Sequence, residues 1–325
     1  MGNRANLVLV DGDSWQLRYS HWAGCRMLDA LIAGPEMAKR YILAQKVASF
    51  WTDELWADGG LVLDLTERRL LFFGDELMST MNERRAMFEA LTILWPGYSI
   101  SWMYDGTAEL AASVNASIPL HDSLSRPELV VAEDTTKLHH LVTVIGQDGR
   151  LRAWPLHWGS SAAWHGPDLI DKLPSAGQHV MKLGILPESG VHVDVPGKSL
   201  GVWLTTPSPG LLRSLPQLWP GWRVQMWGDR YEEHLLRCGP SVTAPELDIT
   251  SGVAEAESWL RQRIFQSFQD SPAGHVASLA RMLGAMEPDS EADWSVAQNT
   301  ERPDAGEWVQ FEAACGQVRS GRAAA

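Results

Sequence analysis

Apolar residues near the start of the chain fall into two short runs on either side of a turn. NLVLV leads through DGD into SWQLRYSHW, and further along LVTVI leads through GQDG into RLRAWPLHW. Runs rich in Val, Leu, Trp and Tyr that flank an Asp-Gly pair are typical of β-hairpins. Each place therefore predicts two paired strands.

After each hairpin, the apolar residues recur at the spacing of a helix. In the first part of the chain, apolar residues recur at the spacing of one helix face at Met27, Leu28, Leu31 and Ile32. A Gly-Pro pair interrupts the pattern, and MAKRYILAQKVASFW resumes it. After the second hairpin the shorter PDLIDKL predicts a brief helix.

A further hairpin and two helices complete the first pattern. LVLDL and RLLFF flank a turn, and ERRAMFEALTILW places Met87, Leu91 and Leu94 on one helix face. Trp-Pro-Gly ends this helix, because proline cannot continue it and glycine accepts a left-handed backbone. YSISWMY then alternates as a strand, and TAELAASV predicts a short helix. The predicted order is ββαββαβα.

The same pattern occurs twice. LWPGYSISWMYDGTAEL reads much like LWPGWRVQMWGDRYEEH, and GGLVLDL is matched by SGVHVDV. His21-Trp22 likewise returns as His157-Trp158. The matching blocks keep their order, and the offset between them falls steadily, which chance matches would not do. We therefore predict an internal duplication, folded as two similar domains or as one pseudo-symmetric domain.

These elements predict an α+β protein of two tandem pseudo-symmetric modules, each an antiparallel sheet with helices on one face, plus a helical C-terminal extension. The predicted regions are 1–114 for the first module, 115–138 for a linker, 139–239 for the second copy and 240–325 for the extension. GVAEAESWLRQRIFQSF and AGHVASLARMLGAM each show one apolar helix face. The acidic stretch from Glu287 predicts a loosely ordered tail.

Three short motifs carry a resemblance. The chain opens on MGNR, continues to the Tyr-x-His-Trp of YSHW, and repeats Trp-Pro-Gly followed by an aromatic residue. In these motifs it resembles uncharacterised bacterial proteins that begin with MGNR and carry a similar Tyr-x-His-Trp. The resemblance covers mainly the first copy and implies no activity and no site residue.

Composition narrows the function classes. The net charge of −13 disfavours a nucleic-acid surface, which needs clustered Lys and Arg, and suits solubility or a basic partner protein. The three cysteines form no CxxC pair, so neither a disulfide framework nor a thiolate zinc site is expected. No apolar run is long enough for a transmembrane helix or a signal peptide. We expect a cytoplasmic protein that binds neither membrane nor nucleic acid.

Four residues at equivalent places in the two copies are candidates for catalysis: His21, His157, Asp64 and Asp194. A histidine at a strand end could act as general base, with Asp11, Asp13 or Asp64 to orient His21. Paired carboxylates lining a cleft between the copies could act as acid and base or bind a metal. The structural alternative is that the histidines cap the cores, and that the aspartates bond to Arg18 or to the adjacent turn.

Sixteen tryptophans are unusual for this length. Those that recur at equivalent places, Trp22, Trp95, Trp158 and Trp219, are expected in the core. Those without strict equivalents are better candidates for a binding surface, where tryptophan is favoured. These are Trp51, Trp56, Trp164 and Trp203.

No familiar catalytic, phosphate-binding or zinc-binding motif occurs in its usual context. GxxxxGK[ST] and HExxH do not occur. The one GxSxG match, GKSLG at 197–201, lies in a predicted hairpin and not at the strand-to-helix turn of a nucleophile elbow. Adjacent His139 and His140 on a strand would point to opposite faces. We expect no metal and no cofactor. The favoured function is a non-enzymatic protein-binding protein, of which immunity and antitoxin proteins are the type considered. The alternative is a hydrolase or small-ligand-binding protein with its site between the two modules.

Overall fold

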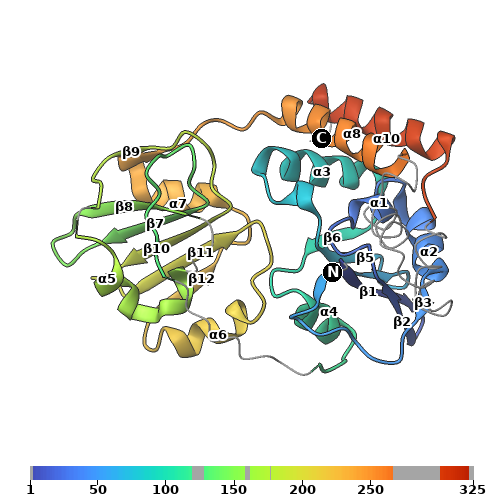
Figure 1. The fold of residues 1–325 in the computed structure, drawn as a ribbon, viewed down its shortest axis with the longest axis horizontal. Coiled ribbons are helices and arrows are strands. Elements are labelled where there is room, and N and C mark those ends of the chain that lie inside the picture. The colour runs from blue at the N-terminus through green and yellow to red at the C-terminus, as the bar shows by residue number, and fades with distance from the viewer. Residues whose placement is uncertain (1–2, 119–127, 158–161, 176, 266–300, 322–325) are drawn as a thin grey trace, which may run out of the picture. The chain divides into compact units, whose positions relative to one another are not determined.

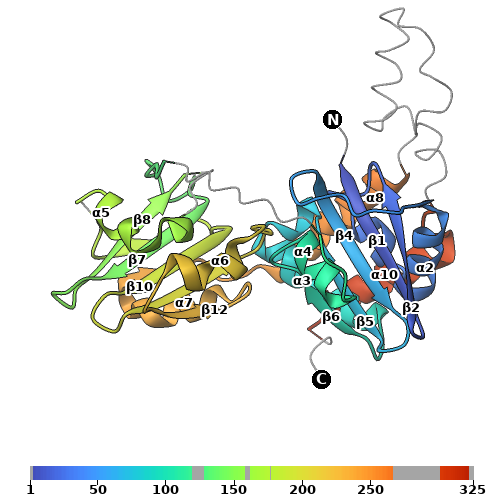
Figure 2. The same cartoon turned by 90° about the horizontal axis from the view of Figure 1, so that it is seen from below.

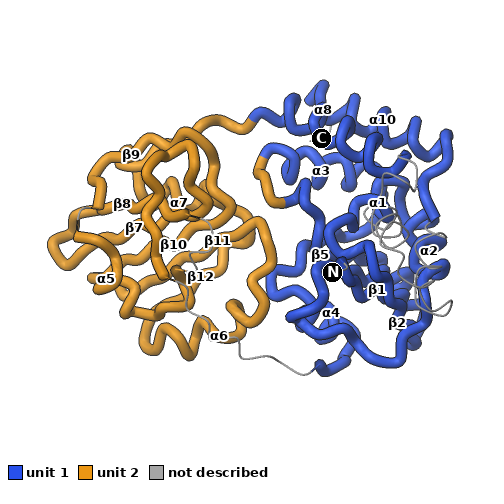
Figure 3. The backbone as a smooth tube through the Cα atoms, viewed as in Figure 1, with its two compact units in different colours: residues 1–78, 82–120, 248–325 blue, residues 79–81, 121–247 orange. Residues whose placement is uncertain are grey.

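The computed structural model describes residues 3–118, 128–157, 162–175, 177–265 and 301–321. The chain divides into two compact units, which are coloured separately in Figure 3. Unit 1 contains residues 1–78, 82–120 and 248–325, and unit 2 contains residues 79–81 and 121–247. The helical extension, predicted as a separate region, therefore belongs to unit 1. Each unit is an α+β fold, as the sequence predicted.

Unit 1 is built around a six-stranded sheet in the order β3-β2-β1-β4-β5-β6 (Figure 1). Its strands are β1 Arg4–Asp11, β2 Ser14–Ser20, β3 Lys46–Val47, β4 Ala57–Asp64, β5 Arg69–Phe73 and β6 Ser99–Trp102. Its helices are α1 Leu28–Leu31, α2 Gly34–Ala44, the 3-10 turn η1 Glu76–Met78, α3 Met81–Leu94, α4 Thr107–Ser113, α8 Ile249–Phe265 and α10 Ala305–Arg319. Apart from the short β3 and η1, the elements up to α4 follow the predicted order.

Unit 2 is built around a five-stranded sheet in the order β12-β11-β10-β7-β8. Its strands are β7 His140–Ile145, β8 Leu151–Leu156, β10 Ser189–Asp194, β11 Ser199–Leu204 and β12 Arg223–Met226, and β9 Met181–Lys182 pairs separately with β13 Val242–Thr243. Its helices are η2 Ala162–Asp168, α5 Leu169–Lys172, α6 Leu211–Leu218, α7 Tyr231–Cys238 and η3 Gly239–Ser241.

Both sheets mix parallel and antiparallel pairs, so the prediction of antiparallel sheets was wrong. β1 pairs antiparallel with β2 but parallel with β4, and β5 pairs parallel with β6 (Figure 2). Unit 2 repeats this arrangement, with β7 antiparallel to β8, β7 parallel to β10, and β11 parallel to β12. A helical segment between strands lets the chain return to the end at which it started, which is what parallel pairing requires.

Helices cover both faces of the sheet in unit 2, whereas the sequence predicted helices on one face only. Strand residues alternate between faces, so Val191 and His192 point to opposite sides. The ring of His234 in α7 lies 5.6 Å from that of His192. On the other side, Ala163 of η2 and Leu211 of α6 line a pocket together with Val191.

The two sheets share strand order and strand direction. In chain order β1, β2, β4, β5 and β6 pair with one another as β7, β8, β10, β11 and β12 do. In the registers, Gly60 lies between Asn6 and Phe73, as Gly190 lies between Leu141 and Trp203. The shared topology agrees with the repeated sequence pattern. The duplication itself stays a prediction.

The repeated Leu-Trp-Pro-Gly has the same geometry in both units. Trp95 and Trp219 are each 1 % exposed, as predicted for core residues. The indole N–H of Trp95 donates to the carbonyl of Leu31 at 2.8 Å, and that of Trp219 donates to Ala163 at 2.8 Å. Trp95 therefore joins the end of α3 to the end of α1, and Trp219 joins the end of α6 to η2. Of the other predicted core pair, Trp22 is half-buried and Trp158 lies outside the described residues.

A glycine lies three residues after each of these carbonyls, Gly34 after Leu31 and Gly166 after Ala163, and close packing requires it. Gly34 and Gly166 have φ of 79° and 62°, a backbone region that favours glycine. A Cβ at Gly34 would lie 2.9 Å from the carbonyl oxygen of Leu94, and one at Gly166 would lie 2.5 Å from that of Leu218. In both units the last turn of a helix therefore rests directly on a glycine.

The C-terminal helices complete the core of unit 1. Val253, Ala256, Leu260 and Ile264 of α8 are buried in the main apolar cluster. So are Trp308 and Phe311 of α10, which begins with a capping box at Asp304 and Glu307. The prediction of a loosely ordered tail was therefore wrong for residues 305–319, because its apolar residues share one helix face and pack inward. The second helix predicted in the extension and Trp294 lie outside the described residues.

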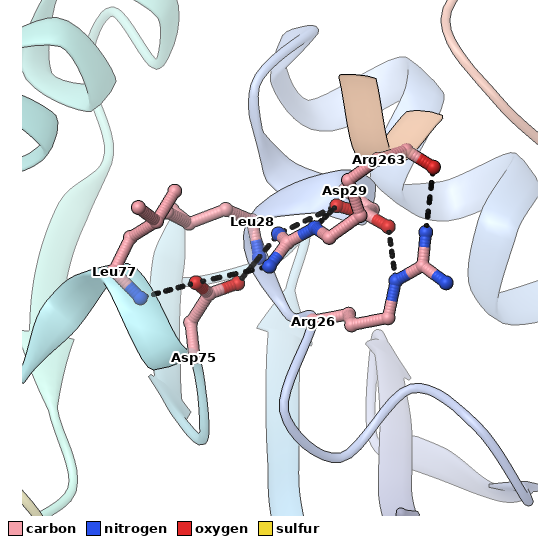
Figure 4. A network of polar contacts seen from close by, with 6 residues as sticks. All are labelled: Arg26, Leu28, Asp29, Asp75, Leu77 and Arg263. Carbon is pink, nitrogen blue, oxygen red and sulfur yellow. Dashed lines mark hydrogen bonds and ion pairs between the residues drawn. The ribbon is translucent and has the colours of Figure 1, made fainter. Parts of the chain in front are cut away.

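A buried network of charges links α8 to the rest of unit 1 (Figure 4). Arg263 forms ion pairs with Asp29 at 2.6 Å and with Asp75 at 2.9 Å. Asp75 also accepts the backbone N–H groups of Leu28 and Leu77. Burial opposes the charge of Arg263, but Asp29 and Asp75 outweigh it and raise the pKa of its guanidinium. The network joins α8, the start of α1 and the turn after β5.

Candidate functional site

The residues predicted for catalysis are divided between the units. His21 and Asp64 belong to unit 1, and His157 and Asp194 belong to unit 2. In unit 1, His21 follows Ser20, which pairs with Ala5, whereas Asp64 pairs with Val10. Ala5 and Val10 are five residues apart on one strand, a separation of about 17 Å. Asp64 therefore lies at the other end of the sheet and does not orient His21.

Unit 2 places its pair in the same way. His157 follows Leu156, which pairs with His140, whereas Asp194 pairs with Ile145 at the far end of the strand. His157 is exposed, and its ring centroid lies 5.9 Å from that of His139. Neither unit alone brings its predicted histidine and aspartate together.

The predicted residues that have short contacts use them in local structure. The Nδ1 atom of His21 lies 2.9 Å from the hydroxyl of Tyr19. Asp64 accepts the backbone N–H groups of Thr66 and Glu67, which confirms the predicted bonds to the adjacent turn, and it pairs with Arg69 at 2.8 Å instead of with Arg18. Burial opposes the charge of Asp64, but the Glu67 N–H, Arg69 and the Thr66 N–H hold its pKa below the usual value. Asp194 accepts the Gly197 N–H in the matching turn.

The four tryptophans predicted for binding occupy different environments. Trp56 is 56 % exposed, and Trp51 and Trp164 are half-buried. Trp203 is 1 % exposed, and its indole N–H donates to Nδ1 of His234 at 3.0 Å, which places it in the interior of unit 2. Trp51 and Trp56 lie in one segment of unit 1, and Trp164 and Trp203 line one pocket of unit 2.

Residues 43–56 of unit 1, here called the apolar segment, expose five large hydrophobic side chains. These are Leu43, Val47, Phe50, Leu55 and Trp56, of which Phe50 is 78 % exposed. Trp15 is also exposed, and its ring lies 6.1 Å from that of Trp51. Single exposed apolar residues are ordinary, but several within one short segment indicate an interaction site.

Hydrogen bonds hold the apolar segment against the sheet. The N–H of Ala48 donates to Leu17 in β2. The buried side chain of Asn6 in β1 accepts the Thr52 N–H at 2.9 Å and donates to the Thr52 carbonyl at 2.8 Å. The segment is therefore anchored to two strands while its apolar side chains face solvent.

A chain of buried polar groups joins β7, β10 and α7 in unit 2. The Thr143 hydroxyl lies 2.8 Å from Nδ1 of His192, 2.6 Å from Nε2 of His234 and 3.6 Å from Sγ of Cys238. Because the Trp203 indole can only donate, Nδ1 of His234 is an acceptor, and its Nε2 carries the proton donated to Thr143. The Thr143 hydroxyl then donates to His192. Each group in the chain has a partner of the opposite kind.

The residue types of this cluster also suit a metal ion. His192, His234 and Cys238 are all buried, and their nitrogen and sulfur atoms lie within 4.8 Å of one another. A metal-bound histidine, however, donates its other ring N–H to a neighbour. The other ring nitrogen of His234 accepts from Trp203 instead, so Nε2 keeps a proton and offers no lone pair. The observed bonds fit a proton-ordered network better than a ligand set.

Burial keeps the network uncharged. Burial, assisted by Arg237, lowers the pKa of His192 to about 4, and burial followed by the neighbouring His192 lowers the pKa of His234 well below its usual value. Burial raises the pKa of the Cys238 thiol to about 11, against a smaller effect from Thr143. At neutral pH both imidazoles and the thiol are neutral, as the hydrogen bonds require.

A second polar cluster lies at the start of β7 and β10. Nδ1 of His140 is 2.8 Å from the hydroxyl of Ser189, its partner across the two strands. Nδ1 of His139 is 3.0 Å from a carboxylate oxygen of Glu188. Burial, and then the adjacent His139, lowers the pKa of His140 to about 4. His140, Glu188 and Ser189 line a pocket of about 260 Å³.

Sequence reasoning missed both clusters for an identifiable reason. It considered His139 and His140 as joint metal ligands, but not the partners that strand pairing gives them. Thr143 and His234 lie in otherwise apolar patterns and were not singled out. A signal was nevertheless present, because the repeat aligns His192 with Val62 and His234 with Leu110. A polar residue opposite an apolar one in a repeat marks a place where the two copies differ.

Comparisons with models of protein families, with curated proteins and with solved structures find nothing that matches this chain. Among the helices that the structure describes, none is long and apolar enough to cross a membrane.

Proposed function

We propose that this protein is a non-enzymatic binding protein, and that it holds a basic partner protein against the apolar segment of unit 1. The observation that carries the proposal is the exposure of Leu43, Val47, Phe50, Leu55 and Trp56 within one short stretch. Aromatic side chains such as Phe50 and Trp56 are enriched in protein interfaces. A cytoplasmic immunity or antitoxin protein, which covers a toxin, is the type of binder that we propose.

The way the segment is held supports binding. Ordering a loop when a partner arrives costs free energy, and a loop that is already ordered avoids that cost. Asn6 and Leu17 fix the backbone at Thr52 and Ala48, so the segment presents its side chains in a set arrangement. The loop is therefore prepared for contact rather than left to collapse onto the sheet.

Charge indicates the kind of partner. The chain has a net charge of −13, and exposed carboxylates are near the apolar surface in sequence at Asp13 and Asp58, while the Arg4 guanidinium lies 5.1 Å over the Trp56 ring. Complementary potentials accelerate association and disfavour partners of like charge. A basic partner would meet apolar residues at the centre of this surface and carboxylates at its rim.

The test uses photo-crosslinking from inside the segment. p-Benzoylphenylalanine is placed at position 50 in one version of the protein and at position 236 in another, because Leu236 is a comparably exposed apolar residue of unit 2. Crosslinking in the native cell and mass spectrometry identify any protein joined at position 50 but not at position 236. That protein is then purified and titrated with this one.

We expect the purified partner to be basic, and Phe50→Ser and Trp56→Ser each to weaken its Kd at least about tenfold, the effect of losing one well-buried contact. Leu236→Ser should leave the Kd unchanged. The proposal fails if the crosslinked protein is acidic or is a second copy of this chain, or if the two serine variants bind as tightly as the unaltered protein.

A further inference from the structure

Unit 2 contains a pocket between one face of its sheet and the segments η2 and α6. Its volume is about 260 Å³. Val142, Val191 and Val202, neighbours across three strands, form one wall, and Ala163 and Leu211 form part of the other. The interior is therefore mostly apolar, as in sites for small organic molecules, and smaller than the about 300–1,000 Å³ of pockets for drug-sized ligands.

Polar groups are concentrated at the edge of this pocket. His140 and Ser189 are bonded at 2.8 Å, and Glu188 stands beside them. Further along, the indole N–H of Trp164 lies 3.4 Å from the hydroxyl of Ser208. An apolar interior with a few fixed polar groups can orient a ligand that has one apolar end and one polar end.

In unit 1 three glycines fill the equivalent space. The register aligns Ser189 with Gly59 and Leu204 with Gly74. A Cβ at Gly59 would lie 2.0 Å from the carbonyl oxygen of Gly24, and one at Gly74 would lie 2.3 Å from the same atom. The backbone closes on itself there, and Ala5 stands where unit 2 has His140. At this edge of the sheet the two units are therefore built differently, and the polar edge of the pocket has no equivalent among these glycines and Ala5 of unit 1.

The charges of the pocket decide which ligands it favours. Of the lining residues that the structure describes, Glu188 is the only one with a formal charge apart from the titratable His140, and none is Lys or Arg. A carboxylate without a cation in the lining repels anions and strengthens hydrogen bonds from a cationic donor. Glu188 keeps part of its surface in solvent while it contacts His139, so it can accept a further donor.

We propose that this pocket binds a small organic amine, with its apolar part against the three valines and its ammonium group against Glu188. The Ser189 hydroxyl and the His140 imidazole supply further hydrogen-bonding groups at the same edge. This site lies wholly in unit 2 and does not depend on the function proposed for the apolar segment of unit 1.

Three probes of similar size but different charge test the proposal: 2-phenylethylamine, 2-phenylethanol and phenylacetate. Each is titrated into the full-length protein by calorimetry and by NMR, with the indole N–H of Trp164, assigned through Trp164→Phe, as a local reporter. Glu188→Gln removes the charge without changing the shape. Ser208→Trp fills the pocket from its rim, and Ser101→Trp on the exposed face of β6 in unit 1 is the matched control. Thr206→Trp, at an exposed rim position, serves if Ser208→Trp does not fold.

We expect the amine to bind at least about tenfold more tightly than phenylacetate, the difference typical of one charge-assisted hydrogen bond, and to shift the Trp164 signal. Glu188→Gln should abolish this preference and leave binding of the alcohol unchanged. Filling the rim should remove binding, and Ser101→Trp should retain it. The proposal is overturned if the amine does not bind at about 1 mM, if phenylacetate binds equally well, or if filling the rim has no effect.

Discussion

Where β1, β4 and α4 of unit 1 meet, the interior is formed by Val8, Val62 and Leu110, whereas the equivalent residues of unit 2 are Thr143, His192 and His234. The strands run in the same order and direction in both units. The comparison teaches that this topology does not depend on an apolar interior at these positions. A polar set is accepted when every donor meets an acceptor, since an unpaired buried group would cost about 1–3 kcal/mol.

The two units also differ in what surrounds the sheet. Unit 1 closes three glycines together at one end of the sheet, adds α8 and α10 to its core, and exposes the apolar segment. Unit 2 leaves a pocket at the corresponding end of its sheet and carries its own polar clusters. The shared elements therefore act as a scaffold, and the candidate sites lie where the units depart from each other.

The largest expected effect concerns the glycine contact of unit 1. Gly59→Ala would bring a methyl group to within 2.0 Å of the Gly24 carbonyl oxygen, a backbone atom that cannot move aside without shifting the strand. We expect unit 1 to lose more than about 4 kcal/mol of unfolding free energy, measured by urea denaturation. Ser189→Ala at the equivalent place adds no atom, and it should cost only about 1–3 kcal/mol because it removes the hydroxyl bonded to His140. Equal costs would show that the two ends of the sheets are packed alike.

A slightly smaller effect is expected at the buried charge network of unit 1. Arg263→Ala leaves Asp29 and Asp75 without their buried partner, which typically costs about 3–5 kcal/mol. Hydrogen exchange should show faster opening of α8, because Arg263 is its link to α1. Arg150→Ala, at an exposed position of unit 2, is the control. Unchanged exchange in α8 after Arg263→Ala would mean that apolar packing alone holds that helix.

The next largest effect is that lowering the pH should destabilise unit 2 more than unit 1. The pKa of His192 is lowered from 6.5 to about 4, so between these values the unfolded chain binds more protons than the folded one. The stability of unit 2 is therefore intact above about pH 6.5 and falls as the pH drops towards 4, by on the order of 3 kcal/mol for His192 alone. His234 and His140 change in the same direction.

Hydrogen exchange compared at about pH 7 and about pH 4.5, after correction for the intrinsic rates, measures this effect peptide by peptide. Peptides from β7, β10 and α7 should lose protection relative to those from β1, β4 and α4. Equal loss in both sets of peptides would contradict the assignment of the acid response to the buried histidines.

The smallest expected effect is the difference in stability between a single variant, His234→Leu, and a triple variant that contains it. His234→Leu removes the partner of both the Trp203 indole and the Thr143 hydroxyl, and we expect a cost of about 1–3 kcal/mol. Adding Thr143→Val and His192→Val gives unit 2 the residues of unit 1. The triple variant should recover part of that loss at neutral pH and should lose most of the acid response, as judged by urea denaturation. A triple variant less stable than the single one would show that unit 2 cannot accept the apolar interior.

The sequence by itself determined the order of the main strands and helices along the chain, the α+β class, and the burial of Trp95 and Trp219. Local pattern is sufficient for these features, since the spacing of apolar residues and the Trp-Pro-Gly stop are encoded within a few residues of each element. Reading the tail by composition failed for α10, because Trp308 and Phe311 stabilise that helix only when unit 1 is present to bury them.

Only the tertiary structure decided which polar and titratable side chains contact one another. His21 and Asp64 occupy repeated positions that suggested a shared role, yet the register places them at opposite ends of one sheet. The pairing of His140 with Ser189 and of Thr143 with two histidines joins residues from different strands and helices. Such contacts depend on strand register and on how helices cross the sheet, and these are set by packing between segments far apart in the chain.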